Sequence, residues 1–340
     1  MLSVFALVVI IVFLALLYNF LNGANDSANA IATVIATKAL TPLKALALAS
    51  IFNLAGAFVV TAVAETIGKG IVSMTVLPTE MFLLVLIGGL VGAILWTFIC
   101  TSLGIPISVT HSLVGGILGA GIVAGGFEII MWAVLTNKVF LAIALGPFVG
   151  FMAGALIFII TSWVLYIFFK KTPSPTTERV FRKLQVISSS FMAFGHGMND
   201  TQNAMGVITV ALLIGGFIPY FDVPWWVKLM CGSVMALGTF LLGWRVIKTV
   251  GWRLAKLEPK HGFSAETGAG IAIVGVSIAG MPVSTTHVLA SAVIGGTFFQ
   301  SLRRIRWSEV GKMFTAWVIT IPLSAIFGGV AYMVLRFGFL

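Results

Sequence analysis

Two short polar motifs stand out in an otherwise apolar sequence. The first holds Asn25, Asp26 and Asn29, and the second holds Asn199, Asp200 and Asn203. Within each motif, spacings of three and four residues put the side chains on one face of a helix. A carboxylate with two carboxamides offers hard oxygen ligands for a small cation such as Na⁺. An acidic residue inside a membrane is energetically costly, so each aspartate indicates a functional site. The alternative is that each Asn-Asp pair caps a helix start.

Two proline-containing segments form a second constellation. Pro106 is followed by Ser108, Thr110, His111 and Ser112, and Pro282 is followed by Ser284, Thr285, Thr286 and His287. Proline ends one helix and serine or threonine begins the next, so 85–126 and 264–300 are predicted to be helical hairpins with tips at these motifs. Helix N–H groups and hydroxyls suit a tetrahedral oxyanion, and both histidines are expected to hydrogen-bond there. The alternative is that the hydroxyls only satisfy backbone groups at a helix break.

Four single residues carry further hypotheses. His196 precedes Asp200 by four residues and shares its face if the helix is continuous, so it could donate to that carboxylate or to an anion. A buried structural histidine is the alternative. Glu65 and Glu266 flank apolar runs, either as part of an ion pathway or as ordinary interfacial acids. His261 lies in a basic gap and is expected to be solvated.

Both constellations occur twice and in the same order. The separation between Asn25 and Asn199 is nearly equal to the separation between Pro106 and Pro282. Two unrelated motifs repeated at nearly one spacing indicate an internal duplication. The chain is therefore expected to comprise a first repeat at 1–169, a basic linker at 170–184 and a second repeat at 185–340.

The composition indicates which elements must hold these residues. The 340 residues are 59% hydrophobic and 9% charged, whereas soluble domains carry about 25% charged residues. Long apolar runs occupy 2–21, 43–64, 81–101, 139–169, 225–244 and 313–338. They are continuous rather than alternating, so they predict membrane helices and not a barrel, and about ten to twelve embedded segments fit the length. The predicted fold class is an all-α polytopic membrane protein with two inverted-topology repeats, broken helices and two re-entrant hairpins.

Positive charge is concentrated in three gaps between the apolar runs. These gaps hold 14 of the 20 basic residues: Lys170, Lys171, Arg179, Arg182 and Lys183; Arg245, Lys248, Arg253, Lys256 and Lys260; Arg303, Arg304, Arg306 and Lys312. The positive-inside rule places them in the cytoplasm, and both termini then lie outside. This distribution favours the lipid bilayer as partner, and no nucleic acid is expected. Cys100 and Cys231 lack nearby His, so no disulfide or zinc site is expected.

At these motifs the sequence resembles the inorganic phosphate transporter (PiT) family of sodium- or proton-coupled phosphate symporters. The resemblance covers essentially the whole chain and rests on 23–30, 195–204, both proline–Ser–Thr–His tips and 243–251. It implies inverted repeats, phosphate at the hairpin tips and cations beside Asp26 and Asp200. It also implies transport roles for Glu65, His196 and Glu266.

The expected function is cation-coupled import of phosphate by alternating access at the cell membrane, with Na⁺ favoured over H⁺ and no cofactor. A sulfate or other oxyanion permease is the alternative within the same class. A passive anion channel and an intramembrane Ser/His enzyme belong to other classes, and the enzyme would need one asymmetric catalytic set where this chain has duplicated groups. The sequence leaves open the stoichiometry, transport of a metal–phosphate complex, and assembly as a homodimer.

Overall fold

Helices make up nearly all the regular structure of the computed structural model, which describes residues 3–242, 247, 254–255 and 257–339. Outside the helices of these residues, only two isolated bridges pair backbone segments, Val72 with Ile130 and Ala255 with Ile305. The prediction of an all-α protein is confirmed. The predicted basic residues Arg245, Lys248, Arg253 and Lys256, and the family-like segment 243–251 except Ile247, lie outside the described residues.

The helices on either side of the central loop have the following bounds. Before it come α1 (Val4–Asn25), α2 (Ser27–Ala36), α3 (Pro42–Gly56), α4 (Ala62–Gly70), α5 (Thr79–Leu103), α6 (Val109–Gly125), the 3₁₀ turn η1 (Phe127–Ile129), α7 (Trp132–Val134), the π-helical η2 (Leu135–Phe140) and α8 (Leu141–Phe168). After it come α9 (Ser174–Ile214), α10 (Trp225–Leu242), α12 (Pro259–Ile278), α13 (Thr285–Phe298), the 3₁₀ turn η3 (Leu302–Arg304) and α14 (Trp307–Phe339).

Several helices have the length and composition of membrane spans. Among the described residues, four helical stretches qualify: Val4–Ala36, Thr79–Leu103, Trp132–Phe168 and Trp307–Gly338. Large apolar side chains such as Phe13, Phe98 and Phe148 point outward from them. An apolar outer surface on long helices is what a bilayer requires, so a polytopic membrane protein is confirmed as the fold class.

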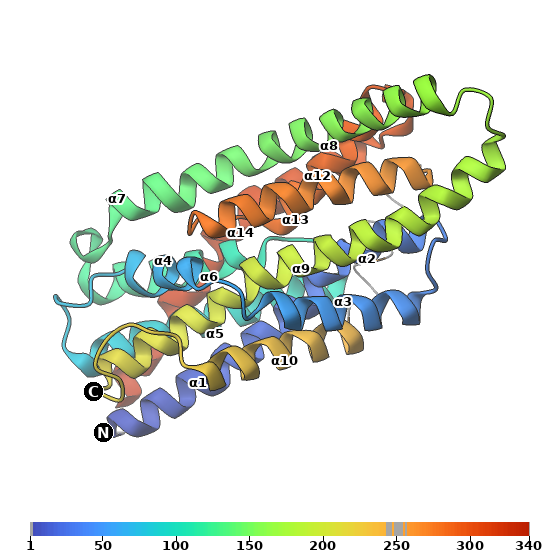
Figure 1. The fold of residues 1–340 in the computed structure, drawn as a ribbon. Helices are drawn as coiled ribbons and strands as arrows, with labels where there is room; N and C mark the ends of the chain where they lie inside the picture. Colours follow the sequence, from blue (N-terminus) through green and yellow to red (C-terminus); the bar gives the residue numbers. More distant parts are fainter. Residues whose placement is uncertain (1–2, 243–246, 248–253, 256, 340) are drawn as a thin grey trace.

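The helices lie along one long axis (Figure 1). α5, α6 and α14 pack together, and so do α8, α12 and α13. α1 lies against α10, and α9 contacts both α3 and α12. The start of α1 and the end of α14 lie at one end of the bundle, whereas the loop between α8 and α9 lies at the other. The long α9 contacts both groups that contain the hairpins, α12 in one and α5 and α6 in the other.

Glycine allows the closest helix contacts. A Cβ atom on Gly116 would collide with the carbonyl of Gly89, and one on Gly328 would collide with that of Gly116. α5, α6 and α14 therefore meet backbone to backbone, as small residues permit in membranes. In the second half, a Cβ atom on Gly295 would collide with the carbonyl of Phe151. The predicted hairpins are present: α5 and α6 form the first, and α12 and α13 form the second.

Candidate functional site

The two Asn-Asp motifs lie differently in their helices. α1 ends at Asn25 and α2 begins at Ser27, so Asp26 interrupts the helix, whereas α9 continues through Asn199 and Asp200. Asp26 occupies the N-cap position of α2, but its side chain makes no capping hydrogen bond. Asp200 lies in a helix interior. Both acids are buried, and neither side chain caps the motif's own helix.

The hairpin tips are built alike. Gly104 and Gly280 adopt the left-handed conformation, with φ of 68° and 69°, which glycine adopts without steric cost. Ser108 and Ser284 then cap α6 and α13, since each hydroxyl accepts the backbone N–H three residues later, at 3.2 and 3.3 Å. The Ser112 hydroxyl donates to the Ser108 carbonyl at 3.2 Å. Each of these three serine side chains thus makes a hydrogen bond in the first turn of its helix.

The first hairpin tip contacts both Asn-Asp motifs. The backbone N–H of Val109 donates to Asp26 Oδ2 at 3.2 Å. From α9, Asn203 Nδ2 donates to Thr110 Oγ1 at 2.8 Å. The start of α6 thus lies between the break in the first helix and the continuous second one.

The second hairpin tip also contacts both Asn-Asp motifs, through two threonine side chains. The Thr286 hydroxyl donates to Asp26 Oδ1, and the Thr285 hydroxyl donates to Asp200 Oδ2 at 3.3 Å. The tips also meet each other, because the rings of His111 and His287 pack edge to face with centroids 4.7 Å apart. The two sequence constellations therefore form one buried cluster at the meeting point of both hairpins.

The first asparagine of each motif forms a hydrogen bond to the first helix of a hairpin. Asn25 Nδ2 donates to Thr101 Oγ1 of α5 at 2.9 Å. Asn199 Nδ2 donates to Ser277 Oγ of α12 at 2.8 Å. Thr101 and Ser277 are separated by the same stretch of sequence as the two tip prolines, so the two contacts are equivalent. The amide nitrogens of these asparagines thus hold the hairpins and leave the oxygens to other partners.

Oxygen atoms without a partner gather on the second motif. Among the described residues, Oδ1 of Asn199, Asp200 and Asn203 is buried and accepts no hydrogen bond. Buried polar atoms are rarely left unpaired, and oxygens of these types are ligands of hard cations. In the first motif, the side chain of Asn29 lies outside what the structure describes.

His196 has the predicted relation to the second motif. Because α9 is continuous, its Nε2 lies 3.4 Å from Asp200 Oδ2. Its Nδ1 lies 2.9 Å from Asn53 Oδ1 on α3. The imidazole therefore lies between two polar groups and is completely buried.

The structure does not bring the two predicted glutamates into the cluster. Glu65 is exposed on α4 and forms an ion pair with Lys69 at 3.0 Å. Glu266 is buried on α12 and accepts hydrogen bonds from three side chains, those of Thr33, Gln185 and Ser188. Glu65 is thus placed as a surface acid, whereas Glu266 forms a separate polar cluster that joins α2, α9 and α12.

The prediction that His261 is solvated is wrong. Its ring is buried and stacks on Phe158, with centroids 5.0 Å apart. It forms a capping box with Glu258 at the start of α12. Arg304 forms an ion pair with Glu258 at 2.7 Å, so described parts of the second and third basic gaps touch. Partial burial opposes ionisation of Glu258, but the Arg304 hydrogen bond and the Lys260 charge hold the pKa of its carboxyl below its ordinary value.

Two residues of the cluster were missed by the sequence analysis. The Tyr18 hydroxyl donates to the carbonyl of Val109 at 3.1 Å, and Asn22 Nδ2 donates to that of Asp200 at 3.4 Å. Tyr18, Asn22 and Asp26 follow one another at intervals of four, so they share a face of α1 as it runs into the break. This polar row in an apolar helix was the available signal.

Comparisons with known proteins agree on one family. A family model described as "Phosphate transporter family" (PHO4) matches residues 22–328. The chain is 39% identical to a "Probable low-affinity inorganic phosphate transporter" of Rhizobium meliloti (strain 1021) over 330 residues, 96% of each chain. It is 39% identical to a Bacillus subtilis (strain 168) protein of the same name over 332 residues, 97% of each.

A solved structure named "The sodium-dependent phosphate transporter" has the same fold. Its TM-score is 0.90 at 24% identity, and the match covers 98% of this chain and 99% of that one. The matched family is one of transporters, which confirms the resemblance found in the sequence and the expectation of a transport protein rather than an enzyme. The chain belongs to the phosphate transporter family.

Proposed function

We propose that this protein is a secondary active transporter that imports inorganic phosphate together with a cation, with Na⁺ as the favoured ion and H⁺ as the alternative. The names of the relatives support phosphate, and the name of the structural neighbour supports sodium. The observation that carries the proposal is the convergence of two helix starts and two buried aspartates, Asp26 and Asp200, on one cluster.

Phosphate is assigned to the space between the hairpin tips. α6 and α13 both begin there, and helix starts present N–H groups that have no partner within the helix, together with the positive end of a dipole. Thr110, Thr285 and Thr286 supply hydroxyls that now bond to the Asn-Asp motifs. The Nε2 atoms of His111 and His287 have no hydrogen-bond partner among the described residues. These groups are the proposed phosphate ligands, and Ser108, Ser112 and Ser284 hold the tips in shape.

The coupling cation is assigned to the oxygens beside the two aspartates. Asp26 and Asp200 lie near each other, because the neighbouring hydroxyls of Thr286 and Thr285 donate to them. Two nearby carboxylates would repel an incoming phosphate strongly, because a buried site screens charge poorly. A cation held by Asp200 with Asn199 and Asn203, and a second beside Asp26 with Asn25 and Asn29, would remove that repulsion. Phosphate binding then requires the cation, which is the basis of symport.

Inverted repeats are part of the proposal. Equivalent features recur at a nearly constant spacing along the sequence. The turns η1 and η3 begin as many residues apart as the two prolines inside helices, Pro147 of α8 and Pro322 of α14. η1 and η3 lie at opposite ends of the bundle (Figure 1). Equivalent turns at opposite ends support two repeats of inverted topology, 1–169 and 185–340, joined by 170–184.

Two surface pockets support alternating access. One, of about 400 Å³, is lined by Gly104–Pro106 of the first tip together with Lys312 of α14. The other, of about 270 Å³, is lined by Gly280 of the second tip together with Lys69 and Lys138. They flank different hairpins, and the cluster between the tips is buried. We assign this conformation to a closed state, from which opening of either hairpin would admit phosphate through the pocket beside it.

The proposed location is the cell membrane, with the three basic gaps in the cytoplasm and both termini outside. The contact between Glu258 and Arg304 supports a common side for the second and third gaps. The start of α1 and the end of α14 lie at the end of the bundle away from the loop joining α8 and α9. Labelling of single cysteines from either side of sealed membranes tests this orientation, which a cytoplasmic terminus would overturn.

Uptake into sealed proteoliposomes tests the function. Labelled phosphate should accumulate against its gradient when an inward Na⁺ gradient is imposed at equal pH on both sides. A pH gradient without Na⁺ should drive uptake only if H⁺ is the coupling ion. Indifference to both gradients would contradict symport and favour a passive channel. Excess unlabelled sulfate should leave uptake unchanged, whereas strong competition would favour the sulfate permease.

A further inference from the structure

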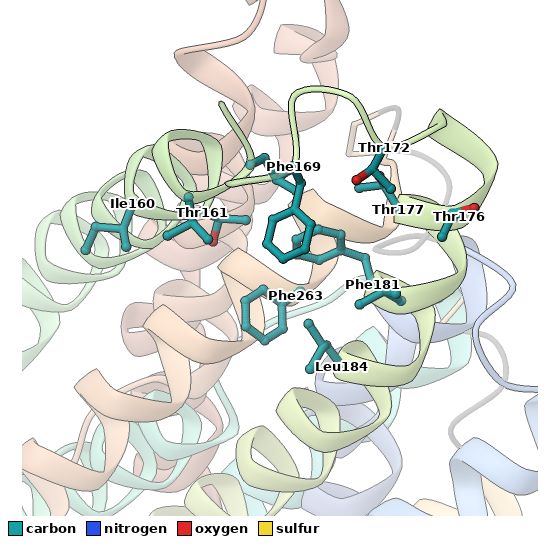
Figure 2. A pocket seen from close by; sticks show the side chains of 12 residues that line it. Ile160, Thr161, Phe169, Thr172, Thr176, Thr177, Phe181, Leu184 and Phe263 are labelled. Carbon is teal, nitrogen blue, oxygen red and sulfur yellow. The ribbon is translucent and has the colours of Figure 1, made fainter. Parts of the chain in front are cut away.

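A mostly apolar groove lies where the first half of the chain passes into the second. Its volume is about 450 Å³, and it is lined by the end of α8, the loop 169–173, the start of α9 and Phe263 of α12. α8 and α9 each pack against α12, so the groove opens between them. Figure 2 shows the rings of Phe169, Phe181 and Phe263 turned toward its interior. Neither the hairpin tips nor the Asn-Asp motifs contribute to it.

The surroundings of the groove place its mouth at the edge of a bilayer. Trp163 and Tyr166, on the last turns of α8, are each 60% exposed, and Phe168 is 73% exposed. Tryptophan and tyrosine gather at the membrane–water interface, and exposed apolar side chains next to them face lipid. The Lys170 ammonium lies 5.1 Å from the centre of the Tyr166 ring, so positive charge begins at the same level.

The charges at the rim are predominantly positive. Residues 170–184 hold five basic side chains and one acid, Glu178. Lys170 and Lys171 stand in the loop between the lining residues Phe169 and Thr172. Lys183 is exposed on α9, three residues after the lining residue Val180, and borders the same helix face.

Arg182 offers a contrast to these lysines. Its guanidinium lies 3.9 Å from Glu178, and the helix period directs both away from the face that lines the groove. Removing the Arg182 charge lowers the net charge of residues 170–184 but leaves the charges at the rim of the groove unchanged. Arg182 is therefore a matched control for the lysines.

We propose that this groove binds one anionic phospholipid, with an acyl chain between α8 and α9 and the headgroup phosphate at Lys170, Lys171 and Lys183. The apolar lining suits a hydrocarbon chain, the opening lies at lipid depth, and lysines that follow a membrane helix attract anionic headgroups. A zwitterionic lipid could fill the same groove but would gain little from the rim. The bound lipid would join the last helix of the first half to the first helix of the second.

Lipid titration of the detergent-purified full chain, followed by native mass spectrometry, tests the proposal. The probes are phosphatidylglycerol and phosphatidylcholine of identical acyl chains. The wild type should bind one phosphatidylglycerol much more tightly than phosphatidylcholine. In a variant with Lys170→Gln, Lys171→Gln and Lys183→Gln, each lost charge should weaken phosphatidylglycerol binding roughly fivefold, and together about a hundredfold. Arg182→Gln should bind as the wild type does.

A second variant tests the groove itself. Val180→Trp should narrow it while leaving the lysines in place, and Val180 is 49% exposed, so the change places no bulk in the core. Phosphatidylglycerol binding should fall in this variant too. Equal binding of both lipids to the wild type would overturn the proposal. If Arg182→Gln lost as much phosphatidylglycerol binding as the lysine variant, the binding would be unspecific charge attraction. If Val180→Trp bound phosphatidylglycerol as the wild type does, the groove would be excluded as the binding site.

Discussion

Replacing Asp200 by asparagine should uncouple the proposed transporter from its cation. The substitution keeps the shape of the side chain and removes one buried negative charge. In the structure, Asp200 Oδ1 has no hydrogen-bond partner among the described residues, and Oδ2 lies near His196 and Thr285. The carboxylate is therefore held in place on one oxygen and is free to bind a cation with the other.

The size of the effect follows from the lost attraction. Two unit charges about 4 Å apart attract by roughly 4 kcal/mol at an effective dielectric constant of about 20. A loss of that size raises a dissociation constant by nearly three powers of ten, since about 1.4 kcal/mol corresponds to a factor of ten. The Na⁺ concentration that half-saturates uptake should thus rise by roughly two to three orders of magnitude.

Two assays measure this change. In proteoliposomes, Asp200→Asn should abolish Na⁺-driven phosphate uptake over the range that saturates the wild type. In thermal unfolding, Na⁺ at about a hundred times its dissociation constant stabilises a protein by roughly 2.7 kcal/mol, so the wild type should gain stability with Na⁺ and the variant should not. Asp222→Asn is the control, because Asp222 is exposed outside the cluster.

The reasoning would be refuted by an unchanged Na⁺ dependence of both uptake and unfolding in Asp200→Asn. It would also be refuted if Asp222→Asn lost Na⁺ dependence to the same extent, since the effect would then reflect net charge. A variant that no longer folds is recognised by its unfolding curve without Na⁺. Because burying a charge is costly, its removal should leave that baseline near the wild type or above it.

Three further predictions rest on other contacts. Thr286→Val removes the donor to Asp26 and should cost about 1 to 3 kcal/mol of site stabilisation, seen as a roughly tenfold or greater loss of phosphate uptake that Thr286→Ser restores. Gly268→Ala places a methyl group 2.7 Å from the Ala153 backbone and should lower the free energy of unfolding by about 1 to 3 kcal/mol, whereas Gly275→Ala, with open space around it in the same helix, should be neutral or stabilising. The pKa of Glu258 is lowered in the folded protein, so its carboxylate stabilises the fold above the ordinary pKa and loses this effect as the pH falls through the lowered pKa. In Glu258→Gln, thermal unfolding should therefore lack the part of the stability loss at acidic pH that this carboxylate causes.

The hairpins were predictable because their signals are local. Glycine at a positive φ, proline in the turn and a capping serine all act within a few residues, so the sequence of each tip specifies its own break. The face shared by His196 and Asp200 was predictable for the same reason, given a continuous helix. Repetition of both motifs pointed to a common site before any tertiary contact was known.

Features that depend on distant partners were not predictable. His261 is buried because Phe158, far away in the sequence, stacks on its ring. The partners of Glu266 come from α2 and α9, and no spacing in the sequence links them to α12. Glu65, by contrast, has its partner Lys69 one helical turn away and remains at the surface. Burial of a single polar residue is decided by the packing of other helices, which a pattern along one segment does not contain.

The contacts of Asp26 suggest how the proposed cation binding and hairpin movement would depend on each other. Its two oxygens accept one bond from each hairpin, from the Val109 N–H and from the Thr286 hydroxyl. Opening either hairpin away from α1 and α2 therefore breaks a bond to the same carboxylate. The buried charge is then left with less compensation, which is costly unless a cation replaces the lost donor. In the proposed transporter, a closed hairpin pair and a bound cation would thus be two ways of stabilising one acid, and this exchange would link the ion gradient to the side on which the site opens.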